Sequence, residues 1–222
     1  MLHTHNNKIY PKYLKRIFDF IFALILLIFV FLLILICALI IKIEDPTTPV
    51  IFTQARPGKN CKIFKIFKLR TMRADTKKNE VNLTDQQRLL KSGELIRKLS
   101  LDELPQIINI LKGEMSFIGP RPLLVEYLDY YTPQENRRHD VLPGITGWAQ
   151  VNGRNGPSWK KRFECDVFYV NNVSLNFDIH IFFKTIYKVF LCKDIKIGSQ
   201  DYKANFYEYR SAERKSNKKV SI

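Results

Sequence analysis

Two adjacent carboxylates, Asp102 and Glu103, stand near the start of the segment SLDELPQIINILKGEMSFIGPRP, and Arg121 stands near its end between two prolines. A carboxylate can attack a phosphorus atom as a nucleophile, and it can also bind Mg²⁺. An arginine suits a phosphate, because its planar guanidinium donates forked hydrogen bonds to phosphate oxygens. These residue types predict a site for a phosphorylated substrate.

The same letters also fit an ordinary structural pattern. Ser100 followed by Glu103 matches a capping box, in which the two side chains satisfy the first N–H groups of a helix. On this segment alone, capping is the commoner explanation. Both interpretations can hold, because the dipole at a helix N-terminus stabilises ionised carboxylates and also attracts phosphate.

The bulk composition narrows the class of protein. The chain has 222 residues, which is enough for one globular domain plus an anchor but not for two full domains. Lys plus Arg is 36 and Asp plus Glu is 21, so the net charge is 36 − 21 = +15. This excess favours an anionic partner, such as nucleic acid, an anionic membrane face or phosphorylated small molecules. The four cysteines are widely spaced without a C-x-x-C motif, which excludes a zinc or disulfide framework and indicates a reducing compartment.

A long apolar run dominates the N-terminal part. Residues 20–41 carry no charge, and as a helix these 22 residues reach roughly 33 Å, enough for the hydrocarbon core of a bilayer. The run is too long for the apolar core of a signal peptide. Residues 1–16 are basic without an acid, which places the N-terminus in the cytoplasm. No Pro, Gly or Ser interrupts the run, so the helix pattern alone favours a simple span with residues 42–222 outside.

A β-hairpin is expected after the anchor. Residues 49–54 predict a short strand, residues 56–60 a turn, and residues 61–72 a second strand in which four cations alternate with apolar side chains. These cations, Lys62, Lys65, Lys68 and Arg70, suit either a solvated strand edge or a surface that faces phosphate or lipid headgroups.

Helices and loops should fill the rest of the chain. We expect a mobile loop over 73–84 and helices over 85–99 (with Gly93 as the weak point), 102–111, 122–131 and 158–169. The glycine-rich stretch 142–156 predicts a connecting loop, or alternatively a phosphate cradle that includes Arg154. Residues 177–192 suit a core helix or one in the membrane interface. No catalytic role is assigned to the scattered histidines.

The predicted fold class is therefore α/β, mostly helical with a short β-hairpin or small sheet. We expect a membrane anchor over residues 1–45 and a catalytic domain over residues 46–207. A basic tail over 208–222 is expected to be disordered.

Five motifs in this order resemble the bacterial sugar transferase family, the monotopic phosphoglycosyl transferases, over roughly residues 12–192. They are KRIFD, FTQARPGKNCKIFKIFKLRTM, LSLDELPQIINILKGEMSFIGPRPLLVEYL, LPGITGWAQVNGRN and SWKKRFECDVFYV. Each motif alone is modest, and together they are highly specific.

The resemblance implies a mechanism. Asp102 would attack the sugar-proximal phosphorus of a UDP-sugar, UMP would leave, and a polyprenyl phosphate would then take the phospho-sugar from Asp102. Glu103 would help hold Mg²⁺ with Asp102 and assist proton handling. The cations expected to bind phosphate groups are Arg97, Arg121, Arg154, Lys59, Lys68 and Arg70.

The resemblance also implies partners and a location. The partners would be the UDP-sugar, the polyprenyl (undecaprenyl) phosphate and an anionic membrane surface, with no nucleic acid. Such an enzyme starts the assembly of a glycoconjugate at the bacterial inner membrane, with its catalytic domain on the cytoplasmic face. The alternative is a membrane-anchored basic binding protein without catalysis.

One departure from the family pattern concerns the anchor. Members often carry Ser-Pro midway along the helix, where this chain has Phe31-Leu32. Because nucleotide-sugars are cytoplasmic, we predict a re-entrant helix that bends by other means.

Overall fold

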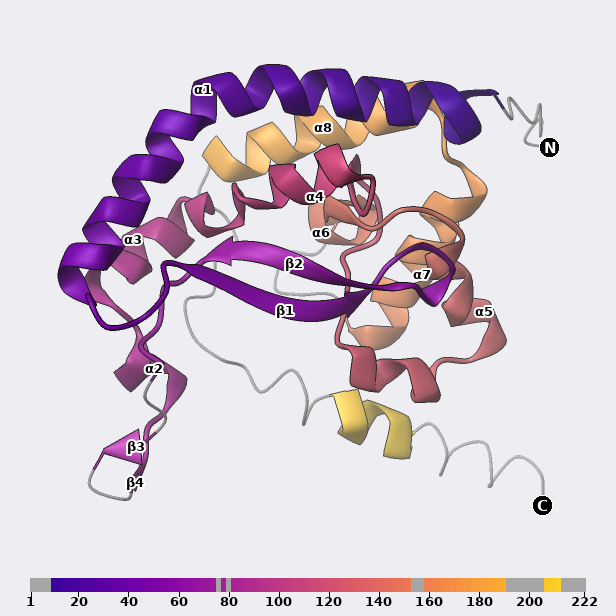
Figure 1. The fold of residues 1–222 in the computed structure, drawn as a ribbon. Helices are drawn as coiled ribbons and strands as arrows, with labels where there is room; N and C mark the ends of the chain where they lie inside the picture. The colour runs from indigo at the N-terminus through magenta and orange to yellow at the C-terminus, as the bar shows by residue number, and fades with distance from the viewer. Residues whose placement is uncertain (1–8, 75–76, 79–80, 153–157, 191–205, 213–222) are drawn as a thin grey trace.

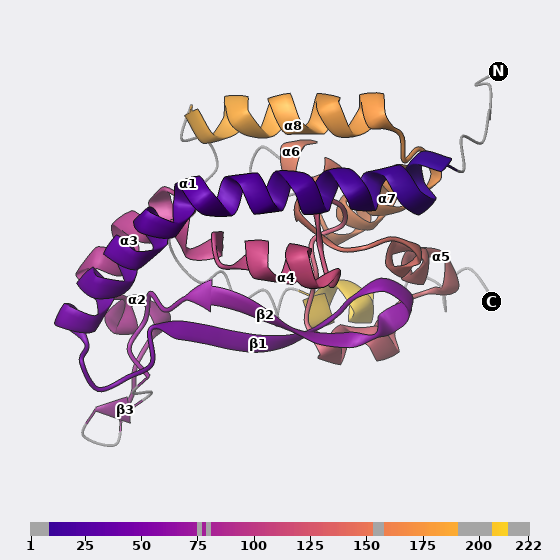
Figure 2. The same cartoon turned by 45° about the horizontal axis from the view of Figure 1, so that its top comes forward.

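The structure is a computed structural model, and it describes residues 9–74, 77–78, 81–152, 158–190 and 206–212. One long helix curves over a set of short helices and a β-hairpin (Figures 1 and 2). Over the described residues the fold is mostly helical with small two-stranded sheets, as the fold-class prediction expects.

The described part of the predicted anchor is helical as far as Glu44. A π-helical turn, Tyr10–Leu14, leads into α1, Lys15–Glu44. Together they form a helix of 35 residues that is long and apolar enough to cross a membrane, and only 11% of its most apolar window is buried. Most of its large side chains therefore face outward, as expected for a helix made to contact lipid.

The helix α1 bends although no Pro or Gly interrupts it (Figures 1 and 2). Its first half packs on α4 and the hairpin through Ala23 and its neighbours, while its second half packs near α3 through Cys37 and Ile41. Phe31 and Leu32 lie between these two contacts, remain helical and are exposed. Packing on one curved surface accounts for the bend, since long helices wrap around the core that they contact.

The predicted hairpin is present with shifted boundaries. Strands β1, Ile51–Pro57, and β2, Ile63–Leu69, pair antiparallel. The connection includes a short 3₁₀ turn, Lys59–Cys61, where Asn60 and Cys61 adopt left-handed φ angles of 54° and 60°. The first strand is longer than predicted, so Arg56 belongs to β1 and not to the turn.

Two local predictions between residues 73 and 99 were wrong. The expected loop contains two-residue strands, β3 (Lys77–Lys78) and β4 (Val81–Asn82). The expected single helix is split into α2 (Asp85–Arg88) and α3 (Lys91–Lys98). The break lies at Leu89-Leu90, while Gly93 is an interior, buried position of α3.

Between residues 101 and 140 the helices are shorter than predicted. A 3₁₀ turn, η3 (Leu101–Glu103), precedes α4 (Gln106–Lys112), which ends at Gly113 with a left-handed φ of 83°. Strand β5 (Ser116–Ile118) follows and pairs in parallel with β6 (Gly144–Thr146). The stretch 122–131 contains a 3₁₀ helix, η4 (Val125–Tyr130), followed by α5 (Pro133–Asn136) and the 3₁₀ turn η5 (Arg137–Asp140).

The glycine-rich stretch is not a plain loop, because it contains β6 and α6 (Trp148–Asn152). Two longer helices follow, α7 (Trp159–Asn171) and α8 (Leu175–Phe190). One side of α8 belongs to the core, where Ile181 is fully buried, whereas Phe183 and Tyr187 on α8 are exposed, and a location in the membrane interface stays a prediction.

The expectation of disorder from residue 208 does not hold for residues 209–212. Residues 206–212 form a helix that continues across the expected boundary. Phe206 is fully buried against Tyr127, and Arg210 forms a buried ion pair with Glu135. Aromatic burial and this ion pair fasten the segment to the domain.

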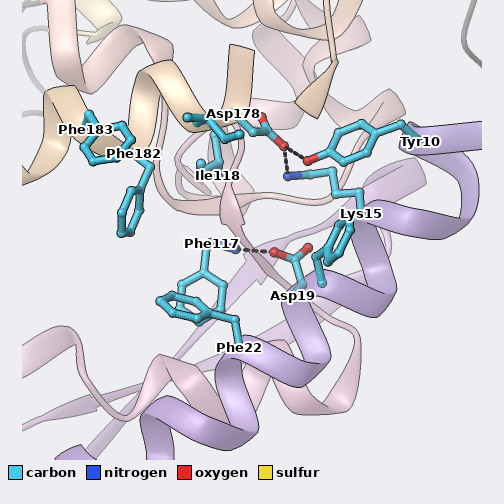
Figure 3. A pocket seen from close by; sticks show the side chains of 11 residues that line it. Tyr10, Lys15, Asp19, Phe22, Phe117, Ile118, Asp178, Phe182 and Phe183 are labelled. Carbon is cyan, nitrogen blue, oxygen red and sulfur yellow. Dashed lines mark hydrogen bonds and ion pairs between the residues drawn. The ribbon is translucent and has the colours of Figure 1, made fainter. Parts of the chain in front are cut away.

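A buried polar cluster joins the start of α1 to α8, beside a cavity of about 410 Å³ (Figure 3). The Asp178 carboxylate accepts hydrogen bonds from Tyr10 at 2.7 Å, Lys15 at 2.6 Å and Tyr169 at 2.7 Å. On the same side, Asp19 accepts from the Phe117 backbone N–H at 3.2 Å. The KRIFD motif thus attaches the anchor to the domain, and Arg16 completes it by donating to the carbonyls of Ile110 and Leu111 at the end of α4.

The far end of α1 is attached as well. The Glu44 carboxylate accepts from the backbone N–H groups of Lys91 and Ser92 at 2.7 and 3.0 Å, at the start of α3. These N–H groups have no partner inside a helix, so the carboxylate of α1 caps α3.

Candidate active site

The carboxylate pair lies in the 3₁₀ turn between α3 and α4. Ser100, just before it, adopts a left-handed φ of 57° and its side chain makes no capping hydrogen bond. The carboxylate of Glu103 turns instead toward two cations, so the capping-box interpretation was wrong.

Lys68 and Arg121 hold Glu103 from both sides. Lys68 Nζ lies 2.6 Å from Glu103 Oε1 and 3.8 Å from Asp102 Oδ2. Arg121 donates to both Glu103 oxygens, with a distance of 3.3 Å to Oε2. Both Glu103 oxygens are therefore engaged, whereas Asp102 has, among the described residues, one longer ion-pair contact, with Lys68.

The two carboxyl groups consequently differ in their proton affinity. Burial raises the pKa of Asp102, although Lys68 opposes this. Burial would also raise the pKa of Glu103, but Arg121 and Lys68 outweigh it and hold that pKa well below its usual range. Neighbouring carboxyl groups with pKa values driven apart are typical of sites in which the two groups have different roles.

Arg97 reaches the site from α3. Its Nε donates to Thr71 Oγ1 at 2.7 Å, and its charge acts to lower the pKa of Asp102. The helix can approach so closely because Gly93 has no side chain: a Cβ there would lie 2.2 Å from the Thr71 carbonyl oxygen.

Asn109 fixes α4 beside the hairpin and thereby fixes the turn before it. Its Nδ2 donates to the Lys65 carbonyl at 2.8 Å and its Oδ1 accepts from the Phe67 N–H at 3.1 Å. The amide thus pairs with the free edge of β2, and it is fully buried. This side chain, together with the core contacts between α4 and β2, sets the distance between Lys68 on β2 and the carboxylates on η3.

The structure brings together five of the predicted site residues and separates others. Those brought together are Asp102, Glu103, Lys68, Arg97 and Arg121. Arg70 instead donates to the Pro49 carbonyl at 2.7 Å. Lys59 lies in the hairpin turn, beyond the start of β2, which is itself about 17 Å along the strand from Lys68 at the usual rise per residue. Arg154 is outside the described residues.

Sequence reasoning missed Arg56. It lies opposite Phe64 in the hairpin and therefore on the same face as Lys68, four residues further along β2. Burial, and then the neighbouring Arg121, lower the pKa of Arg56 to about 10. Strand alternation would have revealed it, had the first strand been extended to Pro57.

The donor set fits a magnesium ion only when substrate oxygens take part. Among the described residues, no group of three or more His, Cys, Asp or Glu side chains could hold a metal. Mg²⁺, however, needs only one or two carboxylates when phosphates and water complete its shell. Asp102 can supply such an oxygen, whereas both oxygens of Glu103 already accept from cations.

Comparisons with known proteins identify the family of this chain. The sequence profile described as bacterial sugar transferase matches residues 10–192. The chain is 48% identical over 183 residues to the uncharacterized sugar transferase EpsL of Bacillus subtilis, covering 82% of this chain and 90% of that protein.

Two relatives have named reactions. The UDP-glucose:undecaprenyl-phosphate glucose-1-phosphate transferase of Escherichia coli is 40% identical over 190 residues, covering 81% of this chain and 41% of that protein. The UDP-N-acetylgalactosamine-undecaprenyl-phosphate N-acetylgalactosaminephosphotransferase of Aeromonas hydrophila is 39% identical over 199 residues, covering 83% of this chain and 47% of that protein.

This chain thus spans less than half the length of these two relatives but nearly all of EpsL. The profile match includes the anchor, the carboxylate turn and the cations around it. The protein is an enzyme that belongs to the bacterial sugar transferase family.

Proposed function

We propose that this enzyme transfers a sugar-1-phosphate from a UDP-sugar to a polyprenyl phosphate and releases UMP. The observation that carries the proposal is the difference in surroundings between the two carboxylates. Glu103 is neutralised by Lys68 and Arg121, while the adjacent Asp102 keeps its oxygens available among cations. The relatives with named reactions use UDP-sugars and undecaprenyl phosphate, which supports the choice of substrates.

In the first step, an Asp102 oxygen bonds to the sugar-proximal phosphorus of the donor. The bond from that phosphorus to the bridging oxygen breaks, and UMP leaves with the bridging oxygen and its electron pair. Splitting the transfer through an aspartyl phosphate replaces one difficult step by two easier ones. Lys68, Arg97 and Arg121 offset the negative charge that the phosphates bring.

In the second step, an oxygen of the polyprenyl phosphate bonds to the phosphorus held on Asp102. The bond between the Asp102 oxygen and phosphorus breaks, which regenerates the carboxylate and yields a lipid-linked diphosphate sugar. Mg²⁺, bound by Asp102 and the substrate phosphates, would supply further neutralisation of phosphate charge.

The site suggests a role for Glu103 that differs from proton transfer. A carboxylate held ionised by two cations is a weak base, because its pKa lies far below the working pH. We propose that Glu103 fixes the positions of Lys68 and Arg121, which in turn contact the phosphates.

A panel of UDP-sugars tests the reaction. With detergent-extracted protein, polyprenyl phosphate and Mg²⁺, we expect UMP release from at least one donor, and the panel identifies the sugar. Without acceptor, one equivalent of UMP per active enzyme should appear together with a phospho-sugar adduct on Asp102. Asp102→Asn should lower turnover at least about 10³-fold.

Asp129→Asn is the matched control. Asp129 is exposed, and this substitution removes the same charge at a position away from the site. A membrane-anchored binding protein without catalysis would release no UMP from any donor. Turnover that survives in Asp102→Asn would exclude the covalent mechanism.

We further propose that both ends of α1 lie on the cytoplasmic side of the inner membrane. The support is the bend of α1, the basic N-terminus and the cytoplasmic origin of nucleotide-sugars. Cysteines introduced near residues 10 and 80 test this with an impermeant thiol reagent in intact cells. Neither should react, and labelling only at position 80 would contradict the re-entrant arrangement.

A further inference from the structure

A second cavity lies at the turn end of the hairpin, between the hairpin turn and the segment from η4 to α5. Its volume is about 470 Å³, and it is lined by Cys61, Leu128, Tyr131, Pro133 and Asn136. Small-molecule pockets of roughly 300–1,000 Å³ typically combine apolar walls with a few polar groups. Here an aromatic ring and two aliphatic residues supply the walls, and the polar groups are the Asn136 amide and the Cys61 thiol, which donates to Asn136 Oδ1 at 3.6 Å.

The walls of this cavity are held by buried contacts. The His139 ring donates from Nδ1 to the Gly58 carbonyl at 3.1 Å, and so attaches the hairpin turn to η5. On the other wall, Thr132 and Glu135 form a capping box at the start of α5, and Glu135 pairs with the buried Arg210. A site built this way exists before a ligand arrives, which reduces the entropy that binding must overcome.

Arg138 links the cavity to the carboxylate pair. It is almost fully buried, donates to the Arg121 carbonyl at 2.7 Å and to the Tyr131 hydroxyl at 3.3 Å, and is neutralised by Asp166 at 2.8 Å. One wall of the cavity is therefore a single residue away from Arg121, whose side chain contacts Glu103.

Arg56 supplies positive charge between the cavity and the carboxylate pair. Its side chain lies on the core face of the hairpin, about 13 Å along the strands from the level of Lys68. Gln54 orients it by accepting a hydrogen bond from Nη2 at 2.7 Å. Over the part of the chain that the structure describes, Arg56 forms no ion pair with a carboxylate.

A partly buried cation without a carboxylate favours an anionic ligand. The carboxylate whose charge acts on the pKa of Arg56, that of Glu103, is already shared by Lys68 and Arg121. The part of such an anion that continues into the cavity should be neutral, because the cavity is lined by Leu128, Tyr131 and Asn136, and a flat ring suits the Tyr131 side chain.

We infer that the cavity binds the nucleoside of the donor and that Arg56 binds the phosphate attached to that nucleoside. This inference rests on the proposed UDP-sugar donor and names the residues that recognise its leaving group. The distal phosphate and the sugar then extend toward Asp102, and UMP is the fragment that the cavity retains after the first step.

Alkylation of Cys61 provides a test that requires no turnover. Cys61 is partly exposed at the cavity, whereas Cys37 and Cys165 are buried. UMP should slow the reaction of Cys61 with a maleimide, while inorganic phosphate, which cannot fill the cavity, should not. Cys61→Ser identifies the labelled thiol.

The Arg56→Gln variant should need about 10- to 100-fold more UMP for half protection, as expected for a lost charge-assisted hydrogen bond. Arg56→Lys keeps the positive charge but loses the forked guanidinium, so the UMP concentration for half protection should rise less than in Arg56→Gln. Lys65→Gln is the matched control, because Lys65 is exposed on the opposite face of the same hairpin and should shift protection less than about 2-fold.

Two results would overturn the inference. One is equal protection by inorganic phosphate and UMP, and the other is protection by UMP that Arg56→Gln and Arg56→Lys leave unchanged. Thermal unfolding of each variant separates loss of binding from loss of fold. An enzyme that turns over UDP-sugars without Cys61 protection would exclude this cavity while leaving the proposed reaction intact.

Discussion

Asp102 and Glu103 are neighbours in sequence, yet their surroundings give them opposite proton affinities. Glu103 is surrounded by cations that lower its pKa, whereas burial raises the pKa of Asp102 and the charge of Glu103 adds to that rise. The low pKa of Glu103 stabilises the fold above about pH 4.3, and this contribution is lost only as the pH falls through its folded-state value. For Asp102 the sign is reversed, because ionising a buried carboxyl group costs stability.

Acidification should therefore inactivate the enzyme through Asp102 alone. As the pH falls, Asp102 takes up a proton first while the Glu103 ion pairs persist, so the rate of single-turnover UMP release should fall with a slope of one. In Glu103→Gln the acidic limb should move to lower pH, because a negative neighbour is removed and Lys68 can turn to Asp102.

The same variant should also lose about 100-fold in rate, because Lys68 and Arg121 lose the group that positions them. The pH–rate profiles of the two proteins check both effects. An acidic limb that moves to higher pH in Glu103→Gln would show that Asp102 is not the group being titrated.

At this scale the sequence predicted the chemistry better than the contacts. The residue types indicated Asp102, Glu103, Lys68, Arg97 and Arg121, which the structure brings together. The sequence could not indicate which of the two carboxylates would be neutralised by cations, because the neutralising side chains come from positions far apart in the chain. Arg56 was missed since a Pro-Gly pair after it favoured a turn over a longer strand.

At the scale of elements, α3 owes its position to a glycine. Alanine is normally better than glycine inside a helix by about 1 kcal/mol. At position 93 the added Cβ would meet the Thr71 backbone oxygen at 2.2 Å, and backbone cannot move aside cheaply.

Gly93→Ala should therefore destabilise the protein by about 1–3 kcal/mol, although helix propensity alone would predict that alanine stabilises it. It should also lower kcat/KM, because α3 would carry Arg97 away from Thr71 and Asp102. Chemical denaturation and kinetics check this, and Glu94→Ala, an exposed change in the same helix, should stay within about 0.5 kcal/mol. A stabilised Gly93→Ala would contradict the close packing.

The sequence predicted most elements but not their boundaries. The hairpin, α7 and α8 followed from apolar patterns and caps. The parallel β5–β6 pair could not be predicted, because its strands are three residues long and their pairing joins segments far apart in the sequence. The break between α2 and α3 depends equally on tertiary contacts, since Met72 pairs with Leu89 there.

At the scale of the whole molecule, Asp178 joins the anchor to the domain. Its carboxylate is almost fully buried and accepts from Tyr10 and Lys15 (Figure 3). It also accepts from Tyr169 on α7. Removal of a buried partner leaves an uncompensated charge and unpaired hydroxyl groups.

Asp178→Ala should destabilise the detergent-solubilised protein by about 3–5 kcal/mol. Asp140→Ala is the control, because Asp140 is exposed and its ion pair with Arg137 at 3.7 Å should contribute less than about 1 kcal/mol. Thermal or chemical unfolding of both variants checks the difference, and similar losses in both would show that the buried cluster does not join anchor and domain.

The attachments at the two ends of α1 have a consequence for how the enzyme meets its lipid substrate. Arg16 is bonded to the last turn of α4, and Glu44 is bonded to the first turn of α3, so the domain does not hang from a flexible tether. In the proposed membrane-bound state, the depth and tilt of α1 would set the height and orientation of Asp102 above the lipid. A polyprenyl phosphate, diffusing in two dimensions, would then meet its reaction partner at one fixed level, and changes in bilayer thickness would act directly on the second step.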